Sequence, residues 1–184
     1  MPNTLLNMLP PDTIVPVFRL KDTNSNNHYS YQELKGSKGT LIMFIGNNCP
    51  FVDYSIDEII MIANDYRVQG IGMIAISSSD YLKEPLDSPE LMAEYAFKNK
   101  IDFPYLHDES QQAARDFSVS YTPDFFLFDR QDQLSYHGQM DDSRPGNGVS
   151  QSGSDLRKAI DAVLYNRTNS GPQKPSNGCS IKWK

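Results

Sequence analysis

Cys49 and Pro50 have the clearest chemical potential in this chain, because they lie where a buried strand gives way to a helix. The apolar run 40–45 predicts the strand, residues 46–48 interrupt it, and an amphipathic pattern begins at Val52. A thiol at the start of a helix faces unpaired backbone N–H groups and the positive end of the helix dipole. Both features favour the thiolate, which is the reactive form of cysteine. We therefore expect a reactive thiol at position 49.

Gly46 precedes Cys49 at the position where a C-x-x-C dithiol site carries its first sulfur. A disulfide between positions 46 and 49 therefore cannot form. Asp53 falls in the first turn of the expected helix, and its negative charge opposes the effect of the helix dipole on a thiolate. Cys179 is the second cysteine of the chain. Thiol–disulfide exchange requires only that two sulfurs meet in space.

The composition is that of a folded protein, since 39% of the 184 residues are hydrophobic and 22% are charged. The net charge of -6 argues against nucleic acid as a partner. No secretory signal is recognisable and the apolar runs are only strand-length, so we expect a cytoplasmic protein with no membrane partner. These features predict one domain over residues 1–167, followed by a tail over 168–184 that carries Cys179.

Strands and helices alternate along the chain. The expected strands cover 15–20, 28–31, 40–45, 71–77, 103–106, 124–128 and 133–136. The expected helices begin after Cys49, at Ser88, near 109 with Asp108 as the cap, and near Ser154. This order predicts an α/β protein of thioredoxin-like fold, in which a central mixed sheet is flanked by helices. It adds an N-terminal β-hairpin extension and an irregular C-terminal tail.

Thr122 and Pro123 lie just before the expected strand at 124–128. In thioredoxin-like folds a cis-proline at this place faces the redox thiol. The residues alone also fit a trans proline at the entry to a strand, and the topology favours the cis form. With this topology we expect Thr122, Pro123 and Pro50 to form the surface that binds substrate.

Four segments carry a resemblance to a known family: GNNCPFVD at 46–53, PDFFLFD at 123–129, DDSRPGN at 141–147 and PSNGCSIKWK at 175–184. The chain resembles the redoxin branch of the thioredoxin superfamily, which includes AhpC/TSA-type and TlpA-like proteins. Within that branch it is similar to bacterial proteins with a C-N-H-C-P motif. The resemblance implies a thioredoxin fold with a redox-type site. It does not define a substrate.

The chain departs from that motif at three positions: Gly46 replaces a cysteine, Asn48 a histidine and Asp53 a lysine. Each change removes a group that would assist a thiolate or its exchange. The first hypothesis is therefore that Cys49 works with Cys179, with the tail folding back over the helix start.

Two other interpretations of Cys49 stay open. In a one-cysteine peroxidase, a thiolate attacks peroxide and becomes a sulfenic acid. Peroxiredoxins carry Thr and Pro where this chain has Gly46 and Ile42, so the pattern fails at both positions. Alternatively, Cys49 is an inert buried thiol in a redox-inactive binding module. Such a module would hold an extended peptide in the groove beside Pro123.

The remaining candidates are weaker. His28, His107 and His137 are widely spaced and predict no metal site. The segment from Asp141 to Arg144 is expected to be a loop held by an Asp–Arg ion pair. Taken together, the sequence predicts a thiol-based oxidoreductase of antioxidant type that needs no cofactor. Its expected partners are protein thiols or disulfides, or a peroxide, with a thioredoxin-type reductant.

Overall fold

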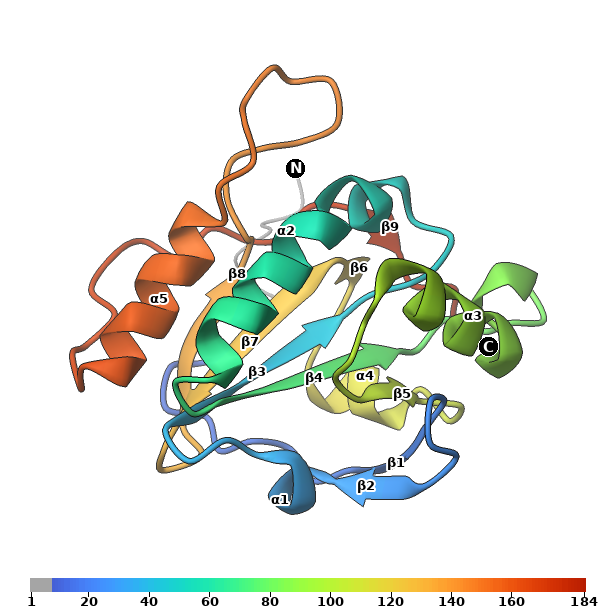
Figure 1. Cartoon of the computed structure of the whole chain (residues 1–184), viewed down its shortest axis with the longest axis horizontal. Helices are drawn as coiled ribbons and strands as arrows, with labels where there is room; N and C mark the ends of the chain where they lie inside the picture. Colours follow the sequence, from blue (N-terminus) through green and yellow to red (C-terminus); the bar gives the residue numbers. More distant parts are fainter. Residues whose placement is uncertain (1–7) are drawn as a thin grey trace.

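The computed structural model describes residues 8–184 and is built around a seven-stranded mixed sheet (Figure 1). Its strand order is β2-β1-β5-β4-β3-β7-β8. The strands are β1 (Arg19–Asp22), β2 (His28–Ser30), β3 (Gly39–Phe44), β4 (Ile71–Ser77), β5 (Tyr105–His107), β7 (Asp124–Asp129) and β8 (Leu134–Gly138). The helices are α1 (Tyr31–Leu34), α2 (Pro50–Arg67), α3 (Pro89–Asn99), α4 (Gln112–Asp116) and α5 (Ser154–Leu164).

The sheet combines parallel and antiparallel pairs. Strands β3, β4 and β5 run parallel to one another, whereas β7 pairs antiparallel with β3 and β8 pairs antiparallel with β7. The hairpin of β1 and β2 joins the other edge through an antiparallel contact between β1 and β5. This arrangement confirms the predicted thioredoxin-like α/β fold with its N-terminal hairpin. None of the helices within residues 8–184 is long and apolar enough to span a bilayer.

Every residue of β3 is buried, because helices cover both faces of the sheet. Leu41 and Met43 point into the core shared with α2, α3 and α5, while Ile42 and Phe44 point into the opposite core. This alternation follows from the two-residue period of a strand. In the second core the ring of Phe44 lies 5.2 Å from that of Phe117. A strand buried on both faces is a rigid support for the loop that follows it.

The tail is better ordered than its composition indicates. Residues Cys179–Ser180 form strand β9, which pairs antiparallel with β6 (Tyr121–Thr122). Figure 1 shows β9, coloured red, beside β6 near the start of α2. Upstream, the Gln139 N–H donates to the Lys174 carbonyl at 3.0 Å, and a Cβ on Gly138 would overlap that carbonyl. The prediction of an irregular tail is therefore wrong for β9.

The prediction of Asp108 as the cap of the helix near 109 is also wrong. Helix α4 begins at Gln112 and its N-cap is Gln111, whose backbone is left-handed with φ 61°. Asp108 instead accepts a hydrogen bond from the Ala114 N–H at 3.0 Å. The 3₁₀ turn η2 (Pro85–Asp87) and the short helix α1 were not expected from the sequence pattern either. Both are too short to produce a clear hydrophobic period.

Candidate active site

Cys49 is the N-cap residue of α2, and Pro50 occupies the first helical position. Proline is well suited to that position because its missing N–H has no partner in a helix anyway. The Cys49 side chain is only 2% exposed, and its thiol donates to the Thr122 carbonyl at 3.2 Å. The Thr122–Pro123 peptide bond is cis. The structure thus places the Cys49 thiol directly beside the residue that precedes Pro123.

Cys179 meets Cys49 at this point. In the pairing of β6 with β9, Cys179 lies opposite Thr122. Both cysteines are free, and their sulfurs are 2.6 Å apart although they are separated by 130 positions in the sequence. Bond formation between them therefore needs only a small movement. Direct contacts join three of the five predicted site residues, Cys49, Cys179 and Thr122, and Pro123 follows Thr122 in the chain. The fifth, Pro50, follows Cys49 in the chain.

The two sulfurs differ in their surroundings. Cys179 is partly exposed, whereas Cys49 is buried. Burial and the neighbouring Cys49 sulfur raise the pKa of Cys179 to about 12, against the opposing effects of the Phe51 N–H and of Lys182. Cys179 therefore holds its proton firmly while Cys49 is next to it. The Phe51 N–H also places the Cys179 sulfur at the N-terminus of α2.

Gly178 allows the tail to approach this closely. A Cβ on Gly178 would overlap the Thr122 carbonyl, and it would lie 3.3 Å from the Pro123 nitrogen. Only a residue without a side chain can therefore bring β9 against β6 in this register. No pattern in the sequence indicates this role, because a glycine in a polar tail usually indicates a turn.

The residues that follow Cys179 are anchored by a buried glutamine. The Gln111 amide donates to the Lys182 carbonyl at 2.8 Å, and its side-chain oxygen accepts from the Lys184 N–H at 2.9 Å. Just before these two residues, Ile181 is buried in the core together with residues of α4. The Asp80 N–H also donates to the Lys182 carbonyl at 2.8 Å. These contacts hold the residues that follow Cys179 and so fix the position of strand β9.

Trp183 forms part of the same anchor. The Arg115 guanidinium lies 5.1 Å from the centre of the indole ring, and the Lys83 ammonium donates to the Trp183 carbonyl. A cation over an indole ring is attracted to its negative face. The last residues of the chain are thus held against α4 and the loop after β4.

Asp87 holds the loop that precedes Cys49. Its carboxylate accepts from the Asn47 N–H at 2.6 Å, and a Cβ on Gly46 would lie 3.3 Å from the same carboxylate. Burial is the largest influence on this group and raises its pKa, although hydrogen bonds from the Asn47 and Asn48 N–H groups oppose the shift. The position where a first sulfur is missing therefore faces a carboxylate with a raised pKa.

This shift predicts an unusual pH dependence for Asp87. A carboxyl whose pKa is raised in the folded state binds its proton more tightly there than in the unfolded chain. Its contribution to stability is therefore full below the unfolded pKa and is lost as pH rises through the folded pKa. We expect the free energy of unfolding of the wild type, relative to Asp87→Asn, to increase as pH falls from about 7 to about 4. Urea unfolding of both proteins across this range measures it. A difference that shrinks towards acid would contradict the raised pKa.

The other positions that depart from the family motif also have defined partners. The Asn48 side chain donates to Glu84 at 2.6 Å, and Asp53 accepts from the Tyr95 hydroxyl at 2.9 Å. Burial, followed by the contact with Asp53, raises the pKa of Tyr95, so this hydroxyl remains a donor. The negative charge of Asp53 in the first turn of α2 is thus partly balanced by a hydrogen bond.

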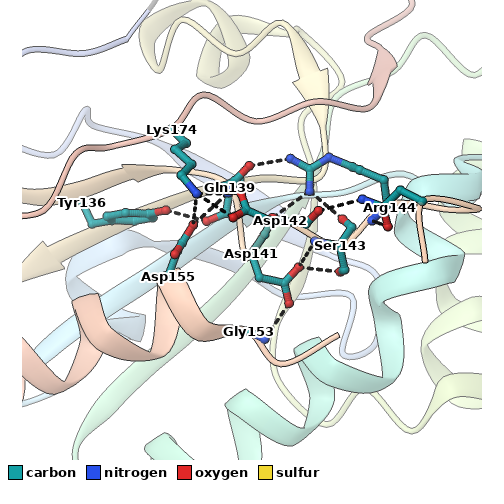
Figure 2. A network of polar contacts seen from close by, with 10 residues as sticks. Tyr136, Gln139, Asp141, Asp142, Ser143, Arg144, Gly153, Asp155 and Lys174 are labelled. Carbon is teal, nitrogen blue, oxygen red and sulfur yellow. Dashed lines mark hydrogen bonds and ion pairs between the residues drawn. The ribbon is translucent and has the colours of Figure 1, made fainter. Parts of the chain in front are cut away.

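The segment from Asp141 to Arg144 forms a closed network, but not the expected one (Figure 2). The Arg144 guanidinium donates to the backbone carbonyls of Asp141 and Ser143, and within residues 8–184 it makes no ion pair. The predicted Asp–Arg ion pair is therefore wrong. Asp142 pairs instead with Lys174 at 2.7 Å, which ties this loop to the start of the tail. The Asp141 carboxylate closes the loop by accepting from the Gly153 N–H at 2.7 Å.

His137 is a buried hydrogen-bonding residue near the site. Its ring nitrogen lies 3.1 Å from the carboxylate of Asp124, the residue after Pro123. The same carboxylate accepts from the Ser176 hydroxyl at 2.6 Å, which gives the tail another anchor. Among the described residues, no cluster of histidine, cysteine and carboxylate side chains is arranged to hold a metal ion.

The strand order and the flanking helices define a thioredoxin-fold protein, in which two free cysteines lie in contact. The profile of the AhpC/TSA family matches residues 11–137, and the chain belongs to that family. Among curated proteins no relative matches the chain.

Two solved structures are similar over almost the whole chain. An uncharacterized conserved protein from Geobacillus kaustophilus is 44% identical, with a TM-score of 0.95, and the match covers 97% of this chain and 94% of that one. A hypothetical protein from Sinorhizobium meliloti 1021 is 41% identical, with a TM-score of 0.93 and 96% of each chain covered.

A more distant structure shares only the fold. A secreted Mycobacterium tuberculosis disulfide oxidoreductase homologous to E. coli DsbE is 16% identical, with a TM-score of 0.60, over 79% of this chain and 95% of that one.

Proposed function

We propose that the protein is a thiol–disulfide oxidoreductase in which Cys49 and Cys179 alternate between a dithiol and a disulfide. The observation that supports this most directly is the 2.6 Å distance between the two sulfurs. The tail supplies the sulfur that Gly46 lacks. The dithiol chemistry of a C-x-x-C motif is thereby rebuilt from two residues that are 130 positions apart in the sequence.

The overall reaction is balanced. A substrate disulfide accepts two electrons and two protons from the Cys49 and Cys179 thiols, and the protein is left with one disulfide bond. A thioredoxin-type dithiol restores the two thiols. Membership of the AhpC/TSA family and the thioredoxin-like fold support protein thiols and disulfides as the substrate class.

A groove-binding module is less well supported. The backbone edge at Thr122, beside Pro123, is already paired with Cys179. An extended peptide would therefore have to displace β9 before it could pair there. A one-cysteine peroxidase also fits poorly, because a second thiol touches Cys49 and would convert a sulfenic acid into a disulfide.

Mild oxidation tests the proposal. We expect diamide to convert the reduced chain into a monomer that is lighter by two hydrogens and has no free thiol, because both sulfurs are already in contact. Intact mass spectrometry with thiol titration measures both changes. Dithiothreitol should restore the original mass and both thiols.

Cys179→Ser is the matched control, since it keeps Cys49 but removes its partner. Under the same treatment it should form no intramolecular bond. With hydrogen peroxide in place of diamide, one oxygen added to Cys49 in the wild type, with no disulfide, would favour the peroxidase instead. Two thiols that resist diamide in the native wild type would contradict the oxidoreductase.

A further inference from the structure

We propose that Cys179 is the sulfur that exchanges with the partner, and that Cys49 is the buried thiol that resolves the mixed disulfide. This assignment rests on the proposed function and adds the order of its steps. It also defines the partner, which presents a solvent-exposed thiol rather than an extended strand laid beside Pro123.

The two sulfurs differ in how accessible they are from solvent. Cys49 is 2% exposed and lies behind β9, whereas Cys179 is partly exposed. A thiolate attacks one sulfur of a disulfide while the other sulfur leaves along the same line. Because Cys49 is almost fully enclosed, an attacking thiolate has little access to its sulfur, whereas part of Cys179 is accessible from solvent.

The start of α2 also acts on the Cys179 sulfur. The Phe51 N–H lies at the N-terminus of α2 and interacts with the Cys179 sulfur, and the positive charge of Lys182 acts on the same sulfur. Helix N-termini and nearby cations stabilise negative charge on sulfur. Both groups therefore oppose the rise in the Cys179 pKa and favour negative charge on its sulfur during exchange.

The seated tail restricts the kind of partner. Strand β9 covers the Thr122 backbone, Gly178 lies on the Thr122 carbonyl, and Gln111 clamps the residues that follow Cys179. While these contacts hold, no extended peptide can pair beside Pro123. A partner must therefore bring its thiol to Cys179 from solvent. A low-molecular-weight thiol and a protruding protein cysteine share this chemistry.

Reduction of the Cys49–Cys179 disulfide takes two exchange steps. The partner thiolate attacks Cys179, a bond forms between these two sulfurs, and the Cys49–Cys179 bond breaks. Cys49 leaves with the electron pair and takes up a proton. A second partner thiolate then attacks the partner sulfur of the mixed disulfide, which releases the oxidised partner and the Cys179 thiol. In the reverse direction, Cys49 attacks Cys179 and displaces the partner.

Single-cysteine variants test the assignment with 5,5′-dithiobis(2-nitrobenzoate) as the probe. We expect the remaining thiol of Cys49→Ser to form a mixed disulfide roughly tenfold or more faster than that of Cys179→Ser, because a buried thiol reacts only through local opening. In denaturant the two variants should react at equal rates. A native Cys179→Ser that reacts as fast as Cys49→Ser would overturn the assignment.

A second measurement uses the wild type and does not depend on how the variants fold. The oxidised chain is mixed with glutathione, quenched with acid and mapped by mass spectrometry. Glutathione should be found on Cys179 and a free thiol on Cys49, and the opposite result would overturn the proposal. Repeating the reaction with thioredoxin shows by relative rate which source of thiol is preferred. The rate comparison of the variants requires no disulfide in the protein, so failure of the proposed function is seen separately in the diamide experiment.

Discussion

Oxidation of the chain is expected to raise its free energy of unfolding by about 3–5 kcal/mol. The Cys49–Cys179 bond would close a loop between residues that are 130 positions apart. A cross-link of that length removes much of the conformational entropy of the unfolded chain, and the chain-entropy relation gives roughly 5 kcal/mol as its upper value. Because the sulfurs already touch in the free dithiol, little native strain opposes the gain. Urea unfolding of the oxidised and reduced forms measures the difference.

Cys179→Ser is again the control, and its stability should not respond to diamide. An oxidised wild type that is no more stable than the reduced form would mean that the bond strains the fold as much as it restricts the unfolded chain. A bond that stabilises the fold is also harder to reduce, because the two equilibria are linked. The stability measurement therefore indicates whether the protein acts mainly as a reductant or as an oxidant.

The part of the site formed by local sequence was predictable. A buried strand that breaks into an amphipathic helix at Cys49 is a short-range pattern, and the structure places that thiol at the N-cap of α2. The sheet was predictable for the same reason, because β3 and β4 are long enough to show continuous apolar runs. Thr122 and Pro123 could be located by their place before β7 in the expected order.

The part formed by long-range contacts was not predictable from a pattern. Strands β6 and β9 have two residues each. Their pairing depends on the absence of a side chain at Gly178 and on the distant side chain of Gln111. The left-handed backbone of Gln111 is unusual for a residue with a side chain. It places the amide where it can bond to Lys182 and Lys184. The sequence left it undecided whether Cys49 and Cys179 lie close together. The pairing of β9 with β6 brings the two sulfurs into contact.

Asp87 shows how the loop before Cys49 is held without a sulfur at position 46. Gly46 has no side chain, and the adjacent loop is held by hydrogen bonds to the Asp87 carboxylate. The loop thus keeps its position without a thiol at 46. Because Cys179 reaches the helix start from the other side, the loop and the second sulfur do not compete for the same place. The site therefore combines a loop fixed by a carboxylate with a sulfur carried by the tail.

Gly178→Ala should have a large effect on both stability and redox chemistry. The Gly178 backbone is not in the left-handed region, so alanine is acceptable to the chain itself, but the new Cβ would overlap the Thr122 carbonyl. Backbone atoms cannot rotate away as a flexible side chain can, so β9 must shift away from β6. We expect a loss of about 1–3 kcal/mol in the free energy of unfolding, as for other overpacked sites. The effective concentration of the Cys179 thiol at Cys49 should fall at least about tenfold.

Gly171→Ala is the matched control, because it changes a glycine of the same tail that has no atom within 4 Å of the new Cβ. Its stability and its thiol–disulfide equilibrium in a glutathione redox buffer should equal those of the wild type. If Gly178→Ala forms the Cys49–Cys179 bond as readily as Gly171→Ala, the close seating of β9 on Thr122 is not what brings the sulfurs together. If only Gly178→Ala loses the bond and the stability that comes with it, the absence of a side chain at position 178 is what allows Cys49 to pair with Cys179.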